Sequence, residues 1–317
     1  MGYMSIRKVS VKQKKRIHNK QDSALVGAVS ATVLAHYGKK LDVLLADKTI
    51  LQVMKAQHIG SVVAGDIVGI FNNQVVGVHP RCSLLSRPGN RDELIAVAAN
   101  VSRIFITVAP TPRPSQTTID RYLIAAEASK IEPVILLNKQ DLLCRDSDSK
   151  LEKLMQIYVN LGYTVIYNSN TLGSSYNELL HILHNNISVF VGQSGVGKSS
   201  IIKRFVDGDV RVGELTTAQH GAHTTTTARL YPLAGGGAII DSPGIREFPL
   251  WPMSSLELTG AFREFKEHAN KCKFRNCTHI EQPQCGIEQA LKSGLISADR
   301  MQSYRLLFDQ LSKLQNI

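Results

Sequence analysis

The sequence predicts three successive domains: a small five-stranded β-barrel, an α/β domain with a parallel sheet, and a helical domain built around a metal site. Three observations lead to this prediction. Five short β-type segments stand near the start of the chain, strands and helices then alternate, and three cysteines with one histidine lie close together near the end. With 317 residues and 43% apolar side chains, the chain can bury sizeable cores.

Positive charge dominates the chain, with a formal net charge of +11. Such an excess indicates a polyanionic partner, either nucleic acid or an anionic membrane surface. Residues 1–20 hold seven basic side chains and no acidic one, and like charges at this density keep a segment disordered unless a polyanion neutralises them. We expect residues 1–22 to form a basic arm, with a merely solvated tail as the alternative.

No apolar run approaches the ~20 residues that are needed to cross a bilayer. The segment Ala24–Ala35 follows the basic arm and imitates a secretory signal. Asp22 before it and the β-branched Val26, Val29 and Thr32 within it favour a first strand instead. We therefore expect a cytoplasmic protein, monomeric and without a membrane partner.

Residues 23–90 consist of short β-type segments separated by turns, which predicts an oligonucleotide-binding (OB) type of barrel with RNA as its partner. Barrels of this size also serve protein contacts and scaffolding, so the partner does not follow from the fold alone. The expected strands are Leu25–Ala35, Lys40–Leu45, Thr49–Lys55, Asp66–Phe71 and Gln74–His79.

From residue 91 to residue 250 strands and helices alternate, which predicts a parallel sheet covered by helices. The expected strands are Ile104–Ala109, Val134–Leu137, Val165–Tyr167 and Val189–Val191, with a hairpin of Ala228–Leu233 and Ala238–Ile240. The expected helices are Thr118–Ser129, Lys150–Leu161, Tyr176–His184 and Lys198–Val206. Residues 251–317 predict a helical domain with helices Ser255–Asn270 and Ala298–Leu314.

A phosphate-binding loop (P-loop) follows the strand Val189–Val191 and opens the next helix, the structural context that this motif requires. Only glycine tolerates its tight backbone, whose N–H groups converge on a β-phosphate. Lys198 is expected to bridge the β- and γ-phosphates, and Ser199 to bind Mg²⁺. The loop and the serine after it comprise Gly192, Gln193, Ser194, Gly195, Val196, Gly197, Lys198, Ser199 and Ser200.

A second motif, Asn138-Lys139-Gln140-Asp141, selects the base and directly follows the strand Val134–Leu137. The Asp141 carboxylate can accept from both the N1–H and the 2-amino group of guanine, and adenine has neither donor. Asn138 is expected to tie this loop to neighbouring segments, and the Lys139 stem to cover the base face. Together with the P-loop, this motif predicts binding of GTP and GDP.

Two further segments complete an Mg²⁺-dependent GTP site. Asp241 ends a strand, where it would hold the metal through water, and the Gly244 N–H would sense the γ-phosphate. Thr224 or Thr225, in a loop after His223, would complete the metal shell when GTP is bound.

The order of these motifs is permuted. Small GTPases carry the P-loop first, whereas here Asn138 precedes Gly192, and Ser169-Asn170 takes the place of the guanine-supporting loop. An active site depends on geometry and not on chain order, so the sequence predicts a circularly permuted GTPase that hydrolyses GTP. Because the chain runs from Asp241–Gly244 directly into the last domain, nucleotide state and the position of that domain should be coupled.

Cys272, Cys277, His279 and Cys285 offer three thiolates and one imidazole, a complete tetrahedral set for one structural zinc ion. Bystander cysteines in a reducing compartment are the alternative, since five cysteines make a poor disulfide framework. Basic side chains around the cluster suit contact with a phosphate backbone; they are Arg263, Lys266, Lys271, Lys273 and Arg275.

With these residues, the chain resembles the bacterial ribosome small-subunit-dependent GTPase A family over essentially its whole length. The matching segments are Asn138–Asp141, Gly192–Ser199, His223–Thr226, Asp241–Gly244, Ala98–Val101 and the cysteine–histidine spacing. The resemblance implies a factor for late maturation of the small (30S) ribosomal subunit, associated with its 16S rRNA, whose GTPase activity that subunit stimulates. The alternative is a GTP-regulated switch for another RNA or a membrane, with incidental hydrolysis.

Two positions depart from common patterns. Asn170 replaces the alanine usual in the guanine-supporting loop, and Ile245 stands where Ras-type enzymes carry a glutamine that orients the attacking water. Ile245 cannot hydrogen-bond to water, so intrinsic turnover should be slow. His223 is the candidate catalytic residue, because a neutral imidazole can accept from water; an rRNA contact is the alternative role.

Overall fold

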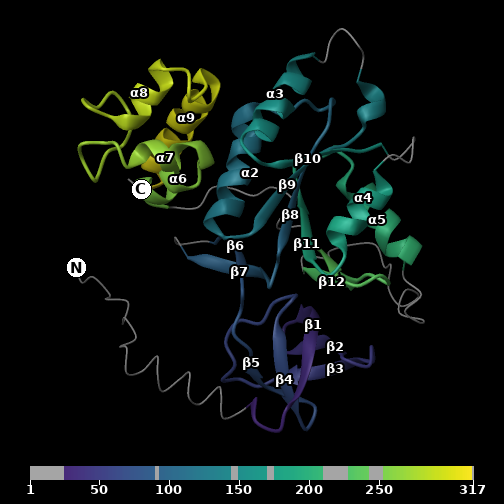
Figure 1. Ribbon diagram of the computed structural model, residues 1–317. Coiled ribbons are helices and arrows are strands. Elements are labelled where there is room, and N and C mark those ends of the chain that lie inside the picture. Colours follow the sequence, from purple (N-terminus) through teal and green to yellow (C-terminus); the bar gives the residue numbers. More distant parts are fainter. Residues whose placement is uncertain are drawn as a thin grey trace, which may run out of the picture.

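The computed structural model describes residues 25–89, 93–143, 149–169, 175–209, 228–242 and 253–315. Within them it contains a β-barrel, an α/β part and a helical part (Figure 1). In the described ranges, no helix combines the length and the apolar character needed to cross a membrane. The predictions for the arm 1–22, Asn170, His223, Thr224, Thr225, Gly244 and Ile245 lie outside the described residues.

The barrel is closed by five strands in the order β1-β2-β3-β5-β4, with β4 pairing back onto β1. β3 and β5 run parallel, and the other neighbours are antiparallel. Val33, Leu41, Val53 and Val75 alternate with outward side chains and fill the interior. The strands are β1 (Val29–Tyr37), β2 (Lys40–Leu45), β3 (Ile50–Lys55), β4 (Ile67–Phe71) and β5 (Gln74–Val78). The predicted five-stranded barrel is thus confirmed.

The α/β part contains a six-stranded sheet in the order β10-β9-β8-β11-β13-β12, which continues into the barrel through a β12–β1 contact. The first five of these strands are parallel, and β12 forms the expected hairpin with β13. Burial on both faces explains the continuous apolar sequences of the central strands. The strands are β8 (Arg103–Val108), β9 (Glu132–Leu137), β10 (Thr164–Tyr167), β11 (Ile187–Val191), β12 (Arg229–Pro232) and β13 (Ala238–Asp241).

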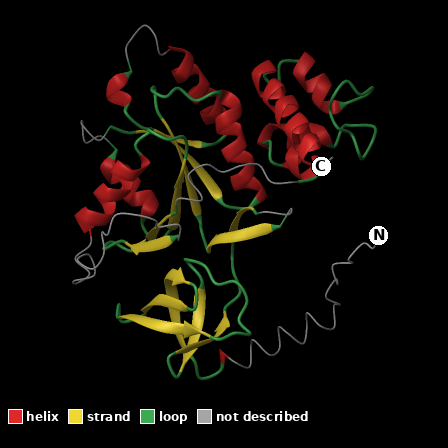
Figure 2. Cartoon of the chain, turned by 180° about the vertical axis from the view of Figure 1, so that it is seen from behind, coloured by secondary structure: helices red, strands yellow, loops and turns green. Residues whose placement is uncertain are grey.

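Helices cover both faces of this sheet (Figure 2). One face carries α2 (Gln116–Ala128) and α3 (Ser149–Asn160), and the other carries α4 (Tyr176–Leu183) and α5 (Lys198–Asp209). Each face has its own apolar cluster, one including Ile119 and Met155 and the other including Leu179 and Phe205. The expected α/β arrangement is therefore confirmed.

A hairpin of β6 (Leu84–Pro88) and β7 (Leu94–Ala99) joins the barrel to the sheet and was not expected from the sequence. Asn100 follows it and spans the junction, because its side-chain Nδ2 donates to Gly65 O (2.8 Å) and its Oδ1 accepts from Cys82 N (2.9 Å). Gly65 has a φ of +88°, and a Cβ there would lie 2.2 Å from Ala99 O. The barrel and the α/β part therefore meet through close backbone contact.

The helical part begins with three short pieces, so the single helix predicted over Ser255–Asn270 is wrong. Phe262 has extended backbone angles (φ −90°, ψ 108°), which ends the first piece and turns the rings of Phe262 and Phe265 into the core. The predicted packing stripe on the last helix, which includes Tyr304, is confirmed. The elements are α6 (Ser255–Gly260), η3 (Arg263–Phe265), α7 (Lys266–Ala269), α8 (Gly286–Lys292) and α9 (Ala298–Gln315).

Helix α2 of the α/β part also packs against the helical part. Ile124 of α2 is buried within the apolar core of the helical part. Arg300 of α9 forms an ion pair with Asp120 of α2 and a second one with Glu264 (Nε–Oε1 2.6 Å), and all three side chains are at most 8% exposed. Tyr158 donates to the same Asp120 carboxylate at 2.7 Å.

Arg263 lies at this same contact and not on a free surface. Its Nε donates to Glu127 (2.5 Å), and its guanidinium lies 3.9 Å from the centre of the Tyr163 ring. Lys266 lies 3.8 Å from the other Glu127 oxygen. The sequence predicts that Arg263 is one of the side chains that suit phosphate contact, but in the structure its main partners belong to the α/β part.

Candidate functional site

The expected nucleotide residues follow the carboxyl ends of neighbouring parallel strands. Val108 of β8 pairs with Leu137 of β9, which pairs with Tyr167 of β10. Val191 of β11 lies beside β8 on the other side. Because these ends share one edge of the sheet, the segments that begin at Asn138, Asn168 and Gly192 are brought together there.

The P-loop needs its glycines for two separate reasons. Gly192, Gly195 and Gly197 have φ values of +139°, +83° and +97°, which side chains on L-residues rarely permit. A Cβ at Gly192 would lie 2.2 Å from Thr107 O, and one at Gly197 would lie 2.4 Å from Asn138 Nδ2. The loop is therefore packed against β8 and against the guanine motif.

Lys198 opens helix α5, where backbone N–H groups and the helix dipole favour an anion. The side chain is buried, and its Nζ donates to Gly192 O and Gln193 O, each at 2.6 Å. A buried ammonium inside a glycine loop is suited to binding phosphate oxygens. Ser199 and Ser200 follow it on the first turn of α5 and are exposed.

The guanine motif is attached to the P-loop by two of its side chains. Asn138 is buried and donates from Nδ2 to Val196 O (2.9 Å). Lys139 donates from Nζ to Gly195 O (2.6 Å). The tie between Asn138 and a neighbouring segment that the sequence predicted is present in the structure.

Asp141 lies in a short 3-10 helix, η1 (Gln140–Leu142), directly after Lys139. Ser169, which is buried two residues after the end of β10, donates from Oγ to Asp141 Oδ1 at 2.5 Å. This bond fixes the carboxylate that the sequence assigns to guanine. The structure thus brings Ser169 to Asp141, as a guanine-supporting loop requires.

Asn168 was not among the site residues expected from the sequence. Its side-chain Nδ2 donates to Asn138 Oδ1 at 2.7 Å, and the residue is only 2% exposed. Its place directly after the apolar strand β10, next to the predicted Ser169, was a signal that could have found it.

Asp241 ends β13, beside the start of the P-loop. Because Ile240 pairs with Val189, Asp241 lies next to Phe190, two residues before Gly192. A carboxylate here and the Ser199 hydroxyl are hard oxygen donors, which suit Mg²⁺. In a GTPase, Mg²⁺ neutralises negative charge on the phosphates.

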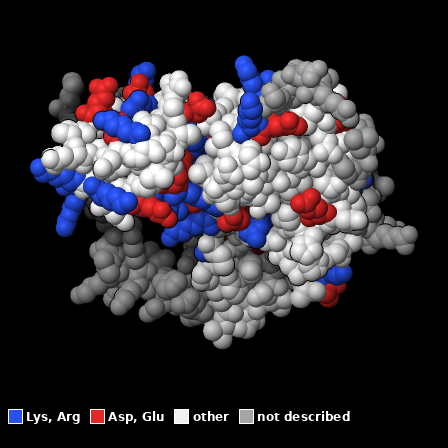
Figure 3. Space-filling model, turned by 45° about the horizontal axis from the view of Figure 1, so that its top comes forward, with Lys and Arg blue, Asp and Glu red and all other residues white. Residues whose placement is uncertain are grey.

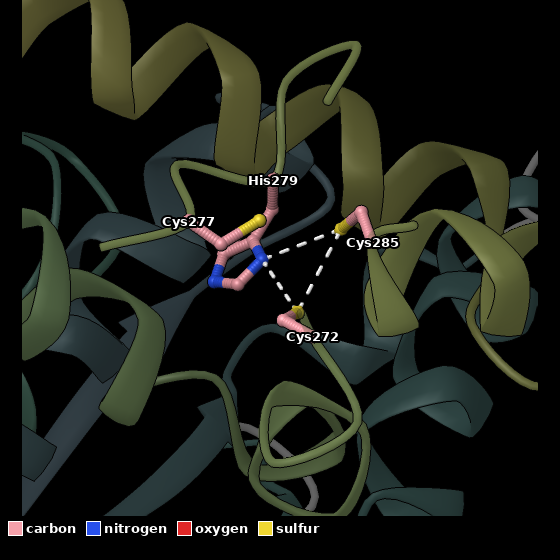
Figure 4. Close-up of side chains that lie close together, drawn as sticks. All are labelled: Cys272, Cys277, His279 and Cys285. Atoms are coloured by element: carbon pink, nitrogen blue, oxygen red, sulfur yellow. Dashed lines mark hydrogen bonds between the residues drawn. The ribbon is translucent and has the colours of Figure 1, made fainter. Parts of the chain in front are cut away.

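The four metal-ligand candidates come together in the helical part (Figure 4). His279 Nδ1 lies 3.5 Å from Cys272 Sγ and 3.5 Å from Cys285 Sγ, and the two sulfurs lie 3.9 Å apart. All four ligand atoms, including Cys277 Sγ, lie within 4.8 Å of one another. A tetrahedral zinc with bonds of about 2.3 Å to sulfur and about 2.0 Å to nitrogen separates its ligands by about 3.5–3.8 Å. The cluster therefore fits one zinc-sized ion.

The surroundings of the cluster also suit a cation. Backbone N–H groups of Gly286 and Glu288 donate to Cys272 Sγ (3.3 Å) and Cys285 Sγ (3.4 Å), as they would to thiolates. Burial raises the pKa of the Cys285 thiol to about 12 and lowers the pKa of His279. A divalent cation would offset the cost of holding thiolates in this buried place.

Replacing one ligand, with Cys277→Ser, should release the metal and unfold the helical part while sparing GDP binding. The reason is that the cluster joins η3, α8 and α9 in one core, whereas the nucleotide residues lie on the sheet. Metal content by mass spectrometry and binding of a fluorescent GDP would be measured on the same sample, with the exposed Cys82→Ser as the matched control. Full metal occupancy in Cys277→Ser would contradict the assignment.

Lysine and arginine side chains gather over the helical part at the left of Figure 3, with acidic side chains among them. In the loop before and within the cluster, Lys271, Lys273 and Arg275 are exposed. They remain available for a polyanion, in contrast to Arg263.

Comparisons with known proteins agree with this geometry. A family model described as RsgA GTPase matches residues 78–251. The Pseudomonas aeruginosa (strain LESB58) protein named "Small ribosomal subunit biogenesis GTPase RsgA" is 45% identical over 280 residues, covering 86% of this chain and 83% of its own length. A Hahella chejuensis protein of the same name is 39% identical over 340 residues and covers 98% of each chain.

Solved structures show the same fold. The crystal structure of YjeQ from Thermotoga maritima superposes with a TM-score of 0.72 and 26% identity, covering 89% of this chain and 98% of its own. YloQ, described as a circularly permuted GTPase, also gives a TM-score of 0.72, with 23% identity and coverage of 90% and 96%. The permuted order of motifs is therefore a property of this fold.

Proposed function

The chain belongs to the RsgA GTPase family, and we propose that it hydrolyses GTP on the immature small ribosomal subunit, late in the maturation of that particle and stimulated by it. Relatives named for small-subunit biogenesis support the partner. The observation that carries the chemistry is the contact of Asn138 and Lys139 with Val196 and Gly195, because it brings a guanine-reading loop onto a phosphate-binding loop.

In this proposal the phosphates lie on Gly192–Ser200, with Lys198 at the β- and γ-phosphates. Guanine is held by Asn138, Lys139, Gln140, Asp141, Ser169 and Asn170. Ser199, Asp241 and either Thr224 or Thr225 bind Mg²⁺, and the Gly244 N–H senses the γ-phosphate. Hydrolysis removes the γ-phosphate that these segments contact, and this change alters the affinity of the protein for its partner.

We also propose that one structural Zn²⁺ is held by Cys272, Cys277, His279 and Cys285. We further propose that 16S rRNA is the polyanion that binds the positively charged surface of the chain. The basic arm 1–22, the barrel 23–90 and the zinc-binding domain 251–317 are the proposed RNA contacts around the GTPase domain 91–250. We propose that the protein is cytoplasmic and monomeric.

The test is GTP turnover by the purified full chain with small subunits, with large subunits and alone. We expect slow intrinsic turnover and an increase of about tenfold or more with small subunits only, as for a GTPase that awaits an activator. Equal stimulation by both subunits, or by neither, would contradict the proposed partner.

His223→Ala should retain binding of GTP and of the small subunit but lose the stimulated turnover. The proposed reason is that docking places this imidazole on the attacking water, which Ile245 cannot orient. The matched control is His220→Ala, in the same segment, which should be stimulated normally. If stimulation survives in His223→Ala, the catalytic group lies elsewhere, for example on the ribosome.

A further inference from the structure

We propose that Asn168 is a positioning residue for guanine binding: its carboxamide sets the orientation of Asn138 and thereby holds the guanine-reading loop onto the P-loop. The inference rests on the proposed nucleotide site but not on the ribosomal partner. The sequence motifs give Asn168 no role.

Asn168 makes hydrogen bonds with both its side chain and its backbone just after β10. Its side chain donates to Asn138 Oδ1 (2.7 Å) and accepts from Ser175 Oγ (2.9 Å). Its backbone N–H donates to Leu137 O (2.8 Å), and its carbonyl accepts from Gln140 N (3.1 Å). Three of these bonds reach residues 137–140, so Asn168 holds the guanine loop from its beginning to the residue before Asp141.

The hydrogen bonds also fix which way each amide faces. Asn138 must present its amino group to the Val196 carbonyl, because a carbonyl can only accept. Asn138 therefore presents its side-chain oxygen to Asn168, and Asn168 must donate to that oxygen from its own amino group. This leaves Asn168 Oδ1 for the Ser175 hydroxyl. A relay of three bonds thus runs from the P-loop to the start of α4.

An acidic side chain cannot complete this relay. In Asn168→Asp, a carboxylate oxygen would face Asn138 Oδ1 at the present 2.7 Å, which is repulsive. If the Asn138 amide turned to satisfy it, the Asn138 oxygen would face the Val196 carbonyl, and the link to the P-loop would be lost. One of the two bonds fails in either orientation, although the side-chain volume is conserved.

A second amide in the same sheet provides the matched control. Asn186 donates from Nδ2 to Ile182 O (2.9 Å) and accepts from Ser102 Oγ (2.8 Å), so it is bonded much like Asn168. It precedes β11, whereas the P-loop follows β11, so Asn186 lies at the opposite edge of the sheet from the nucleotide residues. A variant of Asn186 therefore shows the effect of losing a structural amide without changing the guanine loop.

The experiment compares Asn168→Asp, Asn168→Ala and Asn186→Ala with the natural chain. Three quantities are measured: the dissociation rate of a fluorescent GDP, kcat at saturating GTP, and the melting temperature without nucleotide. We expect both Asn168 variants to release GDP about ten to one hundred times faster, as for a buried polar group that loses its partner. Their kcat should stay within about twofold, and their preference for GTP over xanthosine triphosphate should persist, because Asp141 is intact.

Asn186→Ala should lower the melting temperature and leave GDP release at the natural rate. Unchanged GDP release in Asn168→Asp would overturn the proposal. So would unfolding of both Asn168 variants without nucleotide, because Asn168 would then serve the fold and not the nucleotide. A natural chain that binds GDP but is not stimulated by small subunits would refute the ribosomal function alone and leave the role of Asn168 standing.

Discussion

Asp141→Asn is expected to weaken GTP binding by about one hundred- to one thousandfold and to strengthen binding of xanthosine triphosphate. In the proposed site the carboxylate would accept two hydrogen bonds from guanine, and each bond to a charged group contributes about 1.5–3 kcal/mol. An amide presents a donor to the 2-amino group of guanine, which is itself a donor, but it can donate to the 2-oxo group of xanthine.

The structure supports this exchange at Asp141. Ser169 Oγ donates to one carboxylate oxygen, and an asparagine oxygen can take over that bond. The new amino group would then be left for the base in the proposed site. Competition of both nucleotides against a fluorescent GDP would give the two affinities. Asp141→Ala serves as the control and should bind both nucleotides weakly. Unchanged GTP affinity in Asp141→Asn would remove this residue from the site.

Arg300→Met should lower the free energy of unfolding by about 3–5 kcal/mol, because it leaves Asp120 and Glu264 buried without their shared cation. Urea unfolding of the nucleotide-free chain would measure this loss. The matched control on the same helix is Arg305→Met, whose ion pair with Glu288 is 43% exposed on the arginine side and should contribute less than about 1 kcal/mol. Equal losses in the two variants would contradict the role given to Arg300.

The loss in Arg300→Met should depend on pH with a definite sign. Burial raises the pKa of the Asp120 carboxyl, and Arg300 opposes that rise in the natural chain. Without Arg300 the folded-state pKa of Asp120 increases further, so the folded state of the variant binds a proton more readily than the unfolded state does. Its stability should therefore fall as the pH rises from acidic values toward neutrality, and acid should relieve part of the defect.

Features that are encoded by residues close together in the sequence could be predicted. The P-loop, the guanine motif and the cysteine–histidine cluster are each short, and the strand before Asn138 or Gly192 shows where the motif stands in the sheet. Parallel pairing then brings Asn138 and Val196, which are 58 residues apart, to one edge of the sheet. The alternation of strands and helices already indicates such pairing. The circularly permuted order of the motifs and the five-stranded barrel were predictable because both follow from short segments that are recognisable in the sequence.

Features that depend on distant partners were not predictable from the sequence. Asn168 has an ordinary polar side chain until the fold places Asn138 beside it. Arg300 reads as one more surface cation of the last helix, yet its partner Asp120 is 180 residues away. The break in the helix at Phe262 also depends on tertiary contacts, because burial of the Phe262 and Phe265 rings in the core outweighs local helix propensity.

Helix α2 has a consequence for solubility. Ile124 is 1% exposed because it lies in the apolar core of the helical part, although α2 itself packs against the sheet of the α/β part. If the helical part held the proposed metal and unfolded on losing it, Ile124 would be exposed together with the apolar side chains of that core, such as Phe262 and Phe265. Exposed apolar surfaces of this kind drive self-association. We therefore expect removal of the proposed metal by a chelator to cause self-association of the chain, which light scattering would measure.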